Sequence, residues 1–212
     1  MKKHELRTVM KQTLRDLSDR GGRSVAVWQN LERLEEFQQA VLSHGMIAVY
    51  VSLHEELEGE VETARFFDRI TCPVAVPYCE RGELELFHLQ ALKHPLDELE
   101  PQTLGILEPR SELRADPSRR VLPEELALVV TPGLAFDRTG GRLGRGGGYY
   151  DRVFARIDSK REKPVPKIAL AFDCQILDQV PVEPHDIRLD GIITESEIIR
   201  CRTIIPGRLR FP

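Results

Sequence analysis

Apolar residues recur every three or four positions near the start of the chain. This spacing predicts a first helix with a core-facing stripe at Leu6, Met10, Leu14 and Leu17. Gly21 and Gly22 are expected to break that helix, and Ser24 is a suitable N-cap for a second one. The second helix has apolar positions at Val27, Leu31 and Leu34 and is expected to stop near residues 44–45.

Continuous apolar runs then predict strands that are buried on both faces. These runs begin at residues 46 ("MIAVYVSL"), 72 ("CPVAVPYC"), 126 ("LALVVTPG"), 167 ("KIALAFD") and 190 ("DGIITESEI"). The stretch "ELELFHLQAL" from residue 83 alternates polar and apolar positions, which is typical of an edge strand. A helical stretch is expected around 61–70, and connecting loops over 93–124. Strands that alternate with helices predict an α/β protein with a mainly parallel sheet.

Composition and charge narrow the functional classes. The 212 residues are 41% hydrophobic and 30% charged with a net charge of −4, as in an ordinary soluble protein without general affinity for nucleic acid or membranes. The basic N-terminus lacks the apolar core of a signal peptide, so we expect a cytoplasmic protein. The cysteines lack CxxC spacing and are expected to be reduced and mostly buried thiols at positions Cys72, Cys79, Cys174 and Cys201.

The stretch "RLGRGGGYYDR" over residues 142–152 is the most unusual part of the chain. It matches neither GxxxxGK[ST] nor GxGxxG, the two common phosphate-binding patterns. It is expected to follow a buried strand and precede a helix, and that position is where open α/β sheets bind ligands. Backbone N–H groups of the glycines, the helix N-terminus and the arginines then favour a polyphosphate ligand. The alternative is a tight hairpin with exposed arginines.

Three further features bear on the function of this loop. A cationic stripe and an aspartate each admit two interpretations, and two tyrosines differ in the direction of their side chains. Lys3, Arg7 and Lys11 form a cationic stripe that is either a solvated face or a phosphate-binding edge. Asp151 either complements the helix dipole or binds Mg²⁺ beside a polyphosphate. The spacing of apolar positions turns Tyr150 toward the core, whereas Tyr149 projects from another face toward the loop and its ligand.

The stretch "TPGLAFDRTGGRLGRGGGYYDR" resembles the 5-formyltetrahydrofolate cyclo-ligase family, also called 5,10-methenyltetrahydrofolate synthetases. The resemblance extends to "ALAFDCQILDQVPVEPHDIRLDGII" and, more weakly, to "YVSLHEELEGE", "ILEPR" and "KHELR", in the family's order. It implies one domain over residues 1–212, in which residues 1–45 contribute to the ATP site and 200–212 form an uncertain tail. The implied fold is a three-layer α/β/α domain similar to the ribose-5-phosphate isomerase and CoA-transferase group.

The resemblance further implies ATP- and Mg²⁺-dependent closure of 5-formyltetrahydrofolate to 5,10-methenyltetrahydrofolate, by a monomer. It assigns catalytic roles to Arg145, Tyr149 and Asp151, and Mg²⁺ binding to Asp151 and Asp186. ATP binding falls to Lys3, Arg7, Arg142, Gly144, Arg145, Gly146, Gly147, Gly148 and Tyr150. Folate binding falls to Val51, Glu56, Arg145, Gly146, Gly147, Gly148 and Tyr149.

Two departures separate this chain from the family pattern. Some members carry a lysine within the glycine run where this chain has Gly147, so more of the phosphate charge rests on Arg142 and Arg145. Residues 78–90, where the family covers the folate, match poorly. The alternatives are therefore a related ATP-using enzyme acting on another formamide or pterin-like compound, and a folate-binding protein without turnover.

Overall fold

The computed structural model describes residues 1–52, 60–102 and 107–201. Its centre is a seven-stranded sheet of order β12-β11-β9-β6-β1-β2-β3. The five inner strands are parallel, and β3 and β12 close the two edges in antiparallel orientation. The predicted α/β class with a mainly parallel sheet is thereby confirmed. The strands of this sheet span β1 Met46–Val49, β2 Val74–Glu80, β3 Glu83–Leu89, β6 Leu126–Thr131, β9 Lys167–Leu170, β11 Gly191–Ile193 and β12 Ile198–Arg200.

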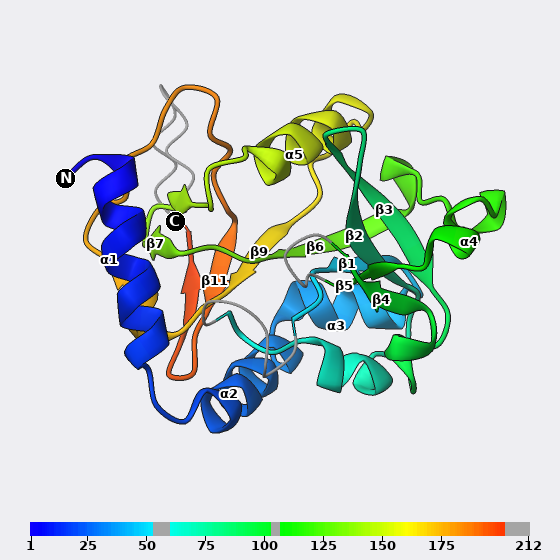
Figure 1. The fold of residues 1–212 in the computed structure, drawn as a ribbon, viewed down its shortest axis with the longest axis horizontal. Coiled ribbons are helices and arrows are strands. Elements are labelled where there is room, and N and C mark those ends of the chain that lie inside the picture. The colour runs from blue at the N-terminus through cyan, green and yellow to red at the C-terminus, as the bar shows by residue number, and fades with distance from the viewer. Residues whose placement is uncertain (53–59, 103–106, 202–212) are drawn as a thin grey trace.

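Helices cover both faces of this sheet (Figure 1). The N-terminal helices pack on one face and α5 packs on the other. The sheet is therefore a middle layer, and its two faces carry two separate hydrophobic cores. The α-helices are α1 Lys3–Asp16, α2 Arg20–Glu32, α3 Glu35–Leu42, α4 Ser111–Arg114 and α5 Tyr149–Ser159.

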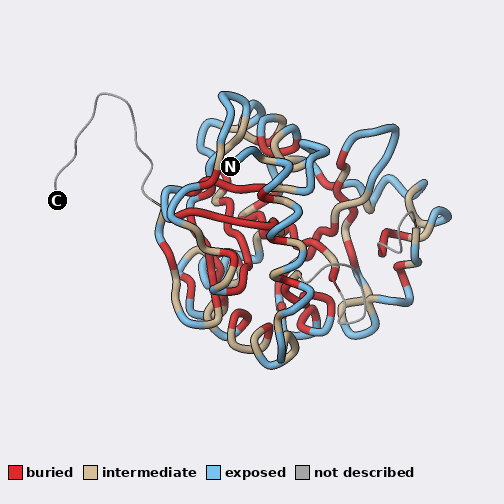
Figure 2. Tube along the Cα trace, turned by 60° about the vertical axis from the view of Figure 1, so that its left-hand side comes forward, coloured by how far each residue is buried: buried red, intermediate tan, exposed pale blue. Residues whose placement is uncertain are grey.

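Alternation along the strands produces these two cores. In β1, Ile47 and Val49 point toward the N-terminal helices, whereas Met46 and Ala48 point toward α5. All four are buried, which is why the run reads as continuously apolar. Figure 2 shows the same burial in red through the central strands, with exposed residues on the outer sides of the helices.

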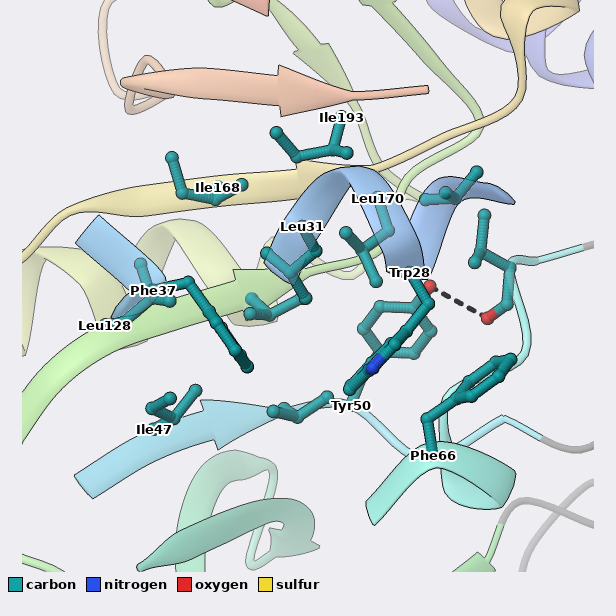
Figure 3. Packing of buried hydrophobic residues seen from close by; sticks show 14 of the residues in the cluster. Trp28, Leu31, Phe37, Ile47, Tyr50, Phe66, Leu128, Ile168, Leu170 and Ile193 are labelled. Carbon is teal, nitrogen blue, oxygen red and sulfur yellow. Dashed lines mark hydrogen bonds between the residues drawn. The ribbon is translucent and has the colours of Figure 1, made fainter. Parts of the chain in front are cut away.

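The core beneath α2 is organised around Trp28, which is completely buried. Its ring stacks on Phe66 with centroids 4.9 Å apart and meets Phe37 edge-on at 6.4 Å (Figure 3). Phe66 belongs to a 3-10 helix at Ala64–Arg69, so the helical stretch predicted for 61–70 is present in this tighter form. This packing fixes the chain that follows β1 against α2.

The predicted start of the second helix is wrong. Helix α2 begins at Arg20 and contains both glycines, because the break falls earlier, at Asp19 with φ of 50°. Asp19 caps the helix by accepting the Gly22 N–H, and a Cβ at Gly22 would lie 2.6 Å from that carboxylate. Ser24 is instead buried, and its hydroxyl accepts the Glu62 N–H.

Two other expectations need adjustment. The segment 93–124 contains short elements, including a two-stranded antiparallel sheet of β4 Leu99–Pro101 and β5 Leu107–Pro109 together with α4. Strands β7 and β8 come between β6 and the glycine loop, so the loop follows β8 and not β6 directly. They belong to a further sheet of order β10-β7-β8. Its strands are β7 Ala135–Asp137, β8 Arg142–Leu143 and β10 Ile176–Leu177.

The remaining expectations concern membrane-spanning helices, the C-terminal tail and the cysteines. In the described residues no helix is both long and apolar enough to cross a membrane. Residue 200 of the uncertain tail closes β12, and residues 202–212 lie outside the described part. The four cysteines are free thiols, as expected, but only Cys72 is buried and Cys79 is exposed.

Candidate functional site

The glycine loop connects β8 to α5 and runs along the surface. Gly146 and Gly148 have φ of 114° and 64°, a backbone region that side chains strongly disfavour, so these two positions require glycine. Gly148 is the N-cap of α5, and the first turn of the helix carries Asp151. The loop therefore presents exposed backbone at a helix N-terminus, as the sequence predicts.

Arg142 is the buried root of this loop. Its Nη2 donates to Asp151 Oδ2 at 2.9 Å, and its guanidinium lies over the rings of Tyr150 and Phe154 at 5.4 and 5.7 Å. The Arg142 Nε is buried and has no hydrogen-bond partner in the described structure. The other Asp151 oxygen accepts the Ile187 N–H at 3.1 Å. Arg142 thus ties the loop to the first turn of α5, and its proposed phosphate contact stays a prediction.

The N-terminal helix brings two cations to the same place. Lys3 Nζ donates to Asp186 Oδ2 at 2.7 Å, and Arg7 Nε donates to the Gly144 carbonyl at 2.9 Å. A Cβ at Gly146 would lie 3.5 Å from Arg7 Cζ, so the guanidinium rests against the loop. The solvated-face interpretation of the cationic stripe is therefore wrong at Lys3 and Arg7.

The environment of the Asp186 carboxylate lowers its pKa. Burial alone would raise its pKa, but hydrogen bonds from Lys3 and the Glu183 N–H, together with the charge of Lys3, lower the pKa below its ordinary value. Asp186 directly precedes Ile187, whose N–H binds Asp151. The two proposed metal-binding carboxylates are therefore neighbours in space: Asp151 is hydrogen-bonded to the residue that follows Asp186.

The donor chemistry here fits Mg²⁺, which takes one or two carboxylates and completes its shell with phosphate oxygens and water. No cluster of three or more potential ligand side chains occurs within residues 1–52, 60–102 and 107–201. A site at Asp151 and Asp186 would hold the ion only in combination with a phosphorylated ligand.

The tip of the loop has a different set of contacts. Arg145 Nη2 and Nε donate to Glu60 Oε1 at 2.9 and 3.1 Å. Glu60 is a carboxylate that the sequence did not single out, although it ends the acidic run "HEELEGE". It stands at the border of residues 53–59, which the structure does not describe, and the proposed folate ligand Glu56 lies among them. Val51 follows β1 and is partly buried against the core under α2.

The two tyrosines diverge as predicted. Tyr150 packs on Phe154 at 5.7 Å between centroids, and burial, followed by the charge of Glu60, raises the pKa of its phenol. Tyr149 stays 37% exposed, and its ring covers Gly147, where a Cβ would lie 2.5 Å from the ring. Gly147 is therefore needed to seat Tyr149, in addition to leaving its backbone accessible.

The fold and loop define an α/β protein whose mainly parallel seven-stranded sheet carries a cation-rich glycine loop at a helix N-terminus. A model of the 5-formyltetrahydrofolate cyclo-ligase family matches residues 1–195. The chain belongs to this family, whose members are ATP-dependent ligases of folate one-carbon metabolism that convert 5-formyltetrahydrofolate to 5,10-methenyltetrahydrofolate.

Relatives of known name agree over most of the chain. The 5-formyltetrahydrofolate cyclo-ligase of Escherichia coli K12 is 33% identical over 174 residues, covering 80% of this chain and 88% of its own. The mouse cyclo-ligase is 30% identical over 202 residues, covering 92% and 94%. Among solved structures, 5,10-methenyltetrahydrofolate synthetase from Aquifex aeolicus superposes with a TM-score of 0.74 at 29% identity, covering 100% of this chain and 97% of that one.

Proposed function

We propose that this chain converts 5-formyltetrahydrofolate to 5,10-methenyltetrahydrofolate with ATP and Mg²⁺, releasing ADP and phosphate. The observation that carries the proposal is that α1 brings Arg7 to the glycine loop and Lys3 to Asp186, whose neighbour Ile187 donates its N–H to Asp151. Cations around an exposed backbone loop and paired carboxylates are what a triphosphate with its metal ion needs. A protein that only sequestered folate would have no use for this combination.

The chemistry explains the need for ATP. The N5-formyl group resembles an amide, and its oxygen is a poor leaving group. Transfer of the γ-phosphoryl group to that oxygen gives an imidate phosphate and ADP. N10 then attacks the formyl carbon, its proton is lost, the C–O bond breaks, and inorganic phosphate leaves. Such a sequence asks the protein mainly for positioning and for neutralisation of charge on the transferred group.

The residues divide this work between them. Phosphate oxygens would pair with Lys3, Arg7, Arg142 and Arg145, and the backbone of residues 144–148 would approach them closely. Mg²⁺, when bound, supplies charge neutralisation between phosphate oxygens, and Asp151 and Asp186 would hold it. Tyr149, which covers Gly147 and faces solvent, would border the folate, with Val51 and Glu56 at the pterin. A glutamate suits the pterin because it accepts two N–H bonds from the 2-amino-pyrimidinone edge.

Cations of the proposed site are paired with carboxylates before any ligand arrives. Lys3 is bound to Asp186, Arg142 to Asp151 and Arg145 to Glu60. The pairing keeps partly buried charges compensated. Phosphate oxygens of the nucleotide would replace the carboxylates as partners of Lys3 and Arg145, and Asp151 and Asp186 would hold Mg²⁺, so ATP and Mg²⁺ should each bind more tightly in the presence of the other.

We further propose that residues 1–212 act as one three-layer domain of the ribose-5-phosphate isomerase type, as a monomer in the cytoplasm. The two cores on opposite faces of one sheet support the single domain. An Arabidopsis thaliana relative, 35% identical over 58% of this chain, is named as mitochondrial. Sedimentation of the purified protein tests the monomer.

A spectrophotometric assay tests the activity. Methenyltetrahydrofolate absorbs in the near ultraviolet, so incubation with 5-formyltetrahydrofolate, ATP and Mg²⁺ should raise the absorbance, and omission of ATP should abolish the rise. Folded protein that binds ATP yet gives no rise would instead favour a related enzyme acting on another formamide or pterin-like substrate, an alternative supported by the poorly matching residues 78–90.

A further inference from the structure

Arg152 is the arginine of the glycine motif that the proposed mechanism leaves unused. It lies in the first turn of α5, a helix that runs beside the hairpin formed by β2 and β3 (Figure 1). Its Nη1 donates to the Gly147 carbonyl at 2.8 Å, and its Nη2 donates to the Gly82 carbonyl at 3.2 Å. Its Nε donates to Glu83 Oε2 at 3.1 Å. One guanidinium therefore bridges the glycine loop and the hairpin tip.

The same guanidinium also holds the ring of Tyr149. Arg152 Cζ lies 5.0 Å from the centroid of that ring, and the ring also lies against Gly147. The ring therefore lies against both a cation and the backbone of the loop, although it is partly exposed to solvent. Because Tyr149 borders the proposed folate site, its position depends on Arg152.

The turn at the hairpin tip, where Arg152 makes this contact, has a well-defined backbone conformation. Arg81 and Gly82 both have positive φ, 51° and 83°, and form the two-residue turn between β2 and β3. Two residues with positive φ are typical of the tight turn that matches the twist of paired strands. The carbonyl of Gly82 therefore has a defined position relative to α5.

Arg156 provides an internal comparison one turn further along α5. Its Nη1 and Nη2 donate to Glu85 Oε1 and the Leu84 carbonyl, both at 2.7 Å. These hydrogen bonds anchor the same hairpin at least as closely as those of Arg152. Within the described part of the chain, however, the acceptors of these hydrogen bonds belong to β3 and not to the glycine loop.

We propose that Arg152 is a positioning residue that fixes Tyr149 and the Gly147 carbonyl relative to the hairpin tip, so that the hairpin and the glycine loop move as one unit. Its effect on catalysis rests on the proposed cyclo-ligase function. The positioning itself is a property of the folded chain and can be measured without turnover.

Hydrogen exchange tests the positioning directly. In Arg152→Ala, amides of residues 81–83 and 146–149 should both exchange faster, whereas in Arg156→Ala the increase should be confined to the hairpin. Unchanged exchange over 146–149 in folded Arg152→Ala would overturn the proposal. If the wild-type protein showed no turnover, the proposed function would be wrong, but the hydrogen-exchange result would still test the positioning role of Arg152.

Steady-state kinetics test the consequence. Arg152→Ala should lower kcat by about tenfold, because a small displacement of groups around the reacting atoms is costly. The KM for ATP should change by less than about twofold, and Arg156→Ala should leave kcat within about twofold. Equal loss of kcat in both variants would show that Arg152 only anchors the hairpin, and would overturn the positioning role.

Discussion

The root and the tip of the glycine loop carry the same residue type in opposite circumstances. Arg142, at the root, is 8% exposed, lies over two aromatic rings and pairs with Asp151. Arg145, three residues later, is exposed and pairs with Glu60 on a different part of the chain. The difference teaches that arginines of one motif can differ in role: Arg142 is part of the internal structure of the loop, whereas Arg145 stands at its surface, where we propose that a phosphate binds.

The largest change in the free energy of unfolding should come from removing the arginine at the root of the loop. Arg142→Ala leaves the Asp151 carboxylate without its cation in a mostly buried setting, so the free energy of unfolding should fall by about 3 kcal/mol. Urea denaturation measures this value. Arg138→Ala is the matched control, because it breaks the exposed Arg138–Glu197 pair and should lower the free energy of unfolding much less than Arg142→Ala does. Equal losses in the two variants would mean that the root arginine has no special structural role.

Breaking the tip should affect turnover instead. Arg145→Ala removes a cation from the proposed site of phosphoryl transfer and should lower kcat by about 10²-fold, comparable to the loss of other electrostatic donors. Its free energy of unfolding should fall by less than that of Arg142→Ala, because the Arg145 side chain is 39% exposed whereas that of Arg142 is 5% exposed. The absorbance assay and urea denaturation give the two values. Unchanged turnover would show that Arg145 only holds Glu60.

The metal response should separate Asp151 from ordinary surface carboxylates. Asp151→Asn should raise the Mg²⁺ concentration needed for half-maximal rate by about tenfold or more, because a direct ligand loses its charge. Calorimetry of ATP binding at several Mg²⁺ concentrations should show the same shift. Asp116→Asn, whose side chain caps a 3-10 helix and lies 3.9 Å from Arg119, serves as the control. An unaltered Mg²⁺ titration would remove Asp151 from the metal site.

The smallest effect concerns pH. The pKa of Asp186 is lower in the folded protein than its ordinary value of about 3.9, so the carboxylate stabilises the fold above that value. This contribution should disappear as the pH falls through the lower, folded-state pKa. The difference in unfolding free energy between wild type and Asp186→Asn should be constant from neutral pH down to about pH 5 and then shrink. A difference that grows on acidification would contradict the Lys3–Asp186 pairing.

Local patterns predicted most of the fold. The stripe of α1, the buried parallel strands and the half-exposed edge strand β3 all follow from short-range periodicity, which neighbouring residues determine. The start of α2 could not be predicted in this way, because Asp19 in a left-handed conformation moves the break away from the two glycines. The small sheet before the loop was missed because β8 is only two residues long and has no periodicity to detect.

The site could be predicted less completely, because its contacts join distant parts of the chain. The pair of Lys3 with Asp186 spans 183 residues, and only the family resemblance indicated both. Glu60 was one of several acids in an unremarkable run. Arg152 was visible within the motif, yet its contact with Gly82 needs the hairpin to fold against α5. Sequence spacing alone provides no signal for such contacts.

Transfer of the phosphoryl group to the formyl oxygen is the central claim, and an oxygen label tests it most directly. With 5-formyltetrahydrofolate carrying ¹⁸O in the formyl group, phosphate released in the presence of ATP and Mg²⁺ should contain one ¹⁸O atom for each molecule of methenyltetrahydrofolate formed. Mass spectrometry of the phosphate reports this ratio. Unlabelled phosphate, released in step with product, would contradict phosphorylation of the formyl oxygen.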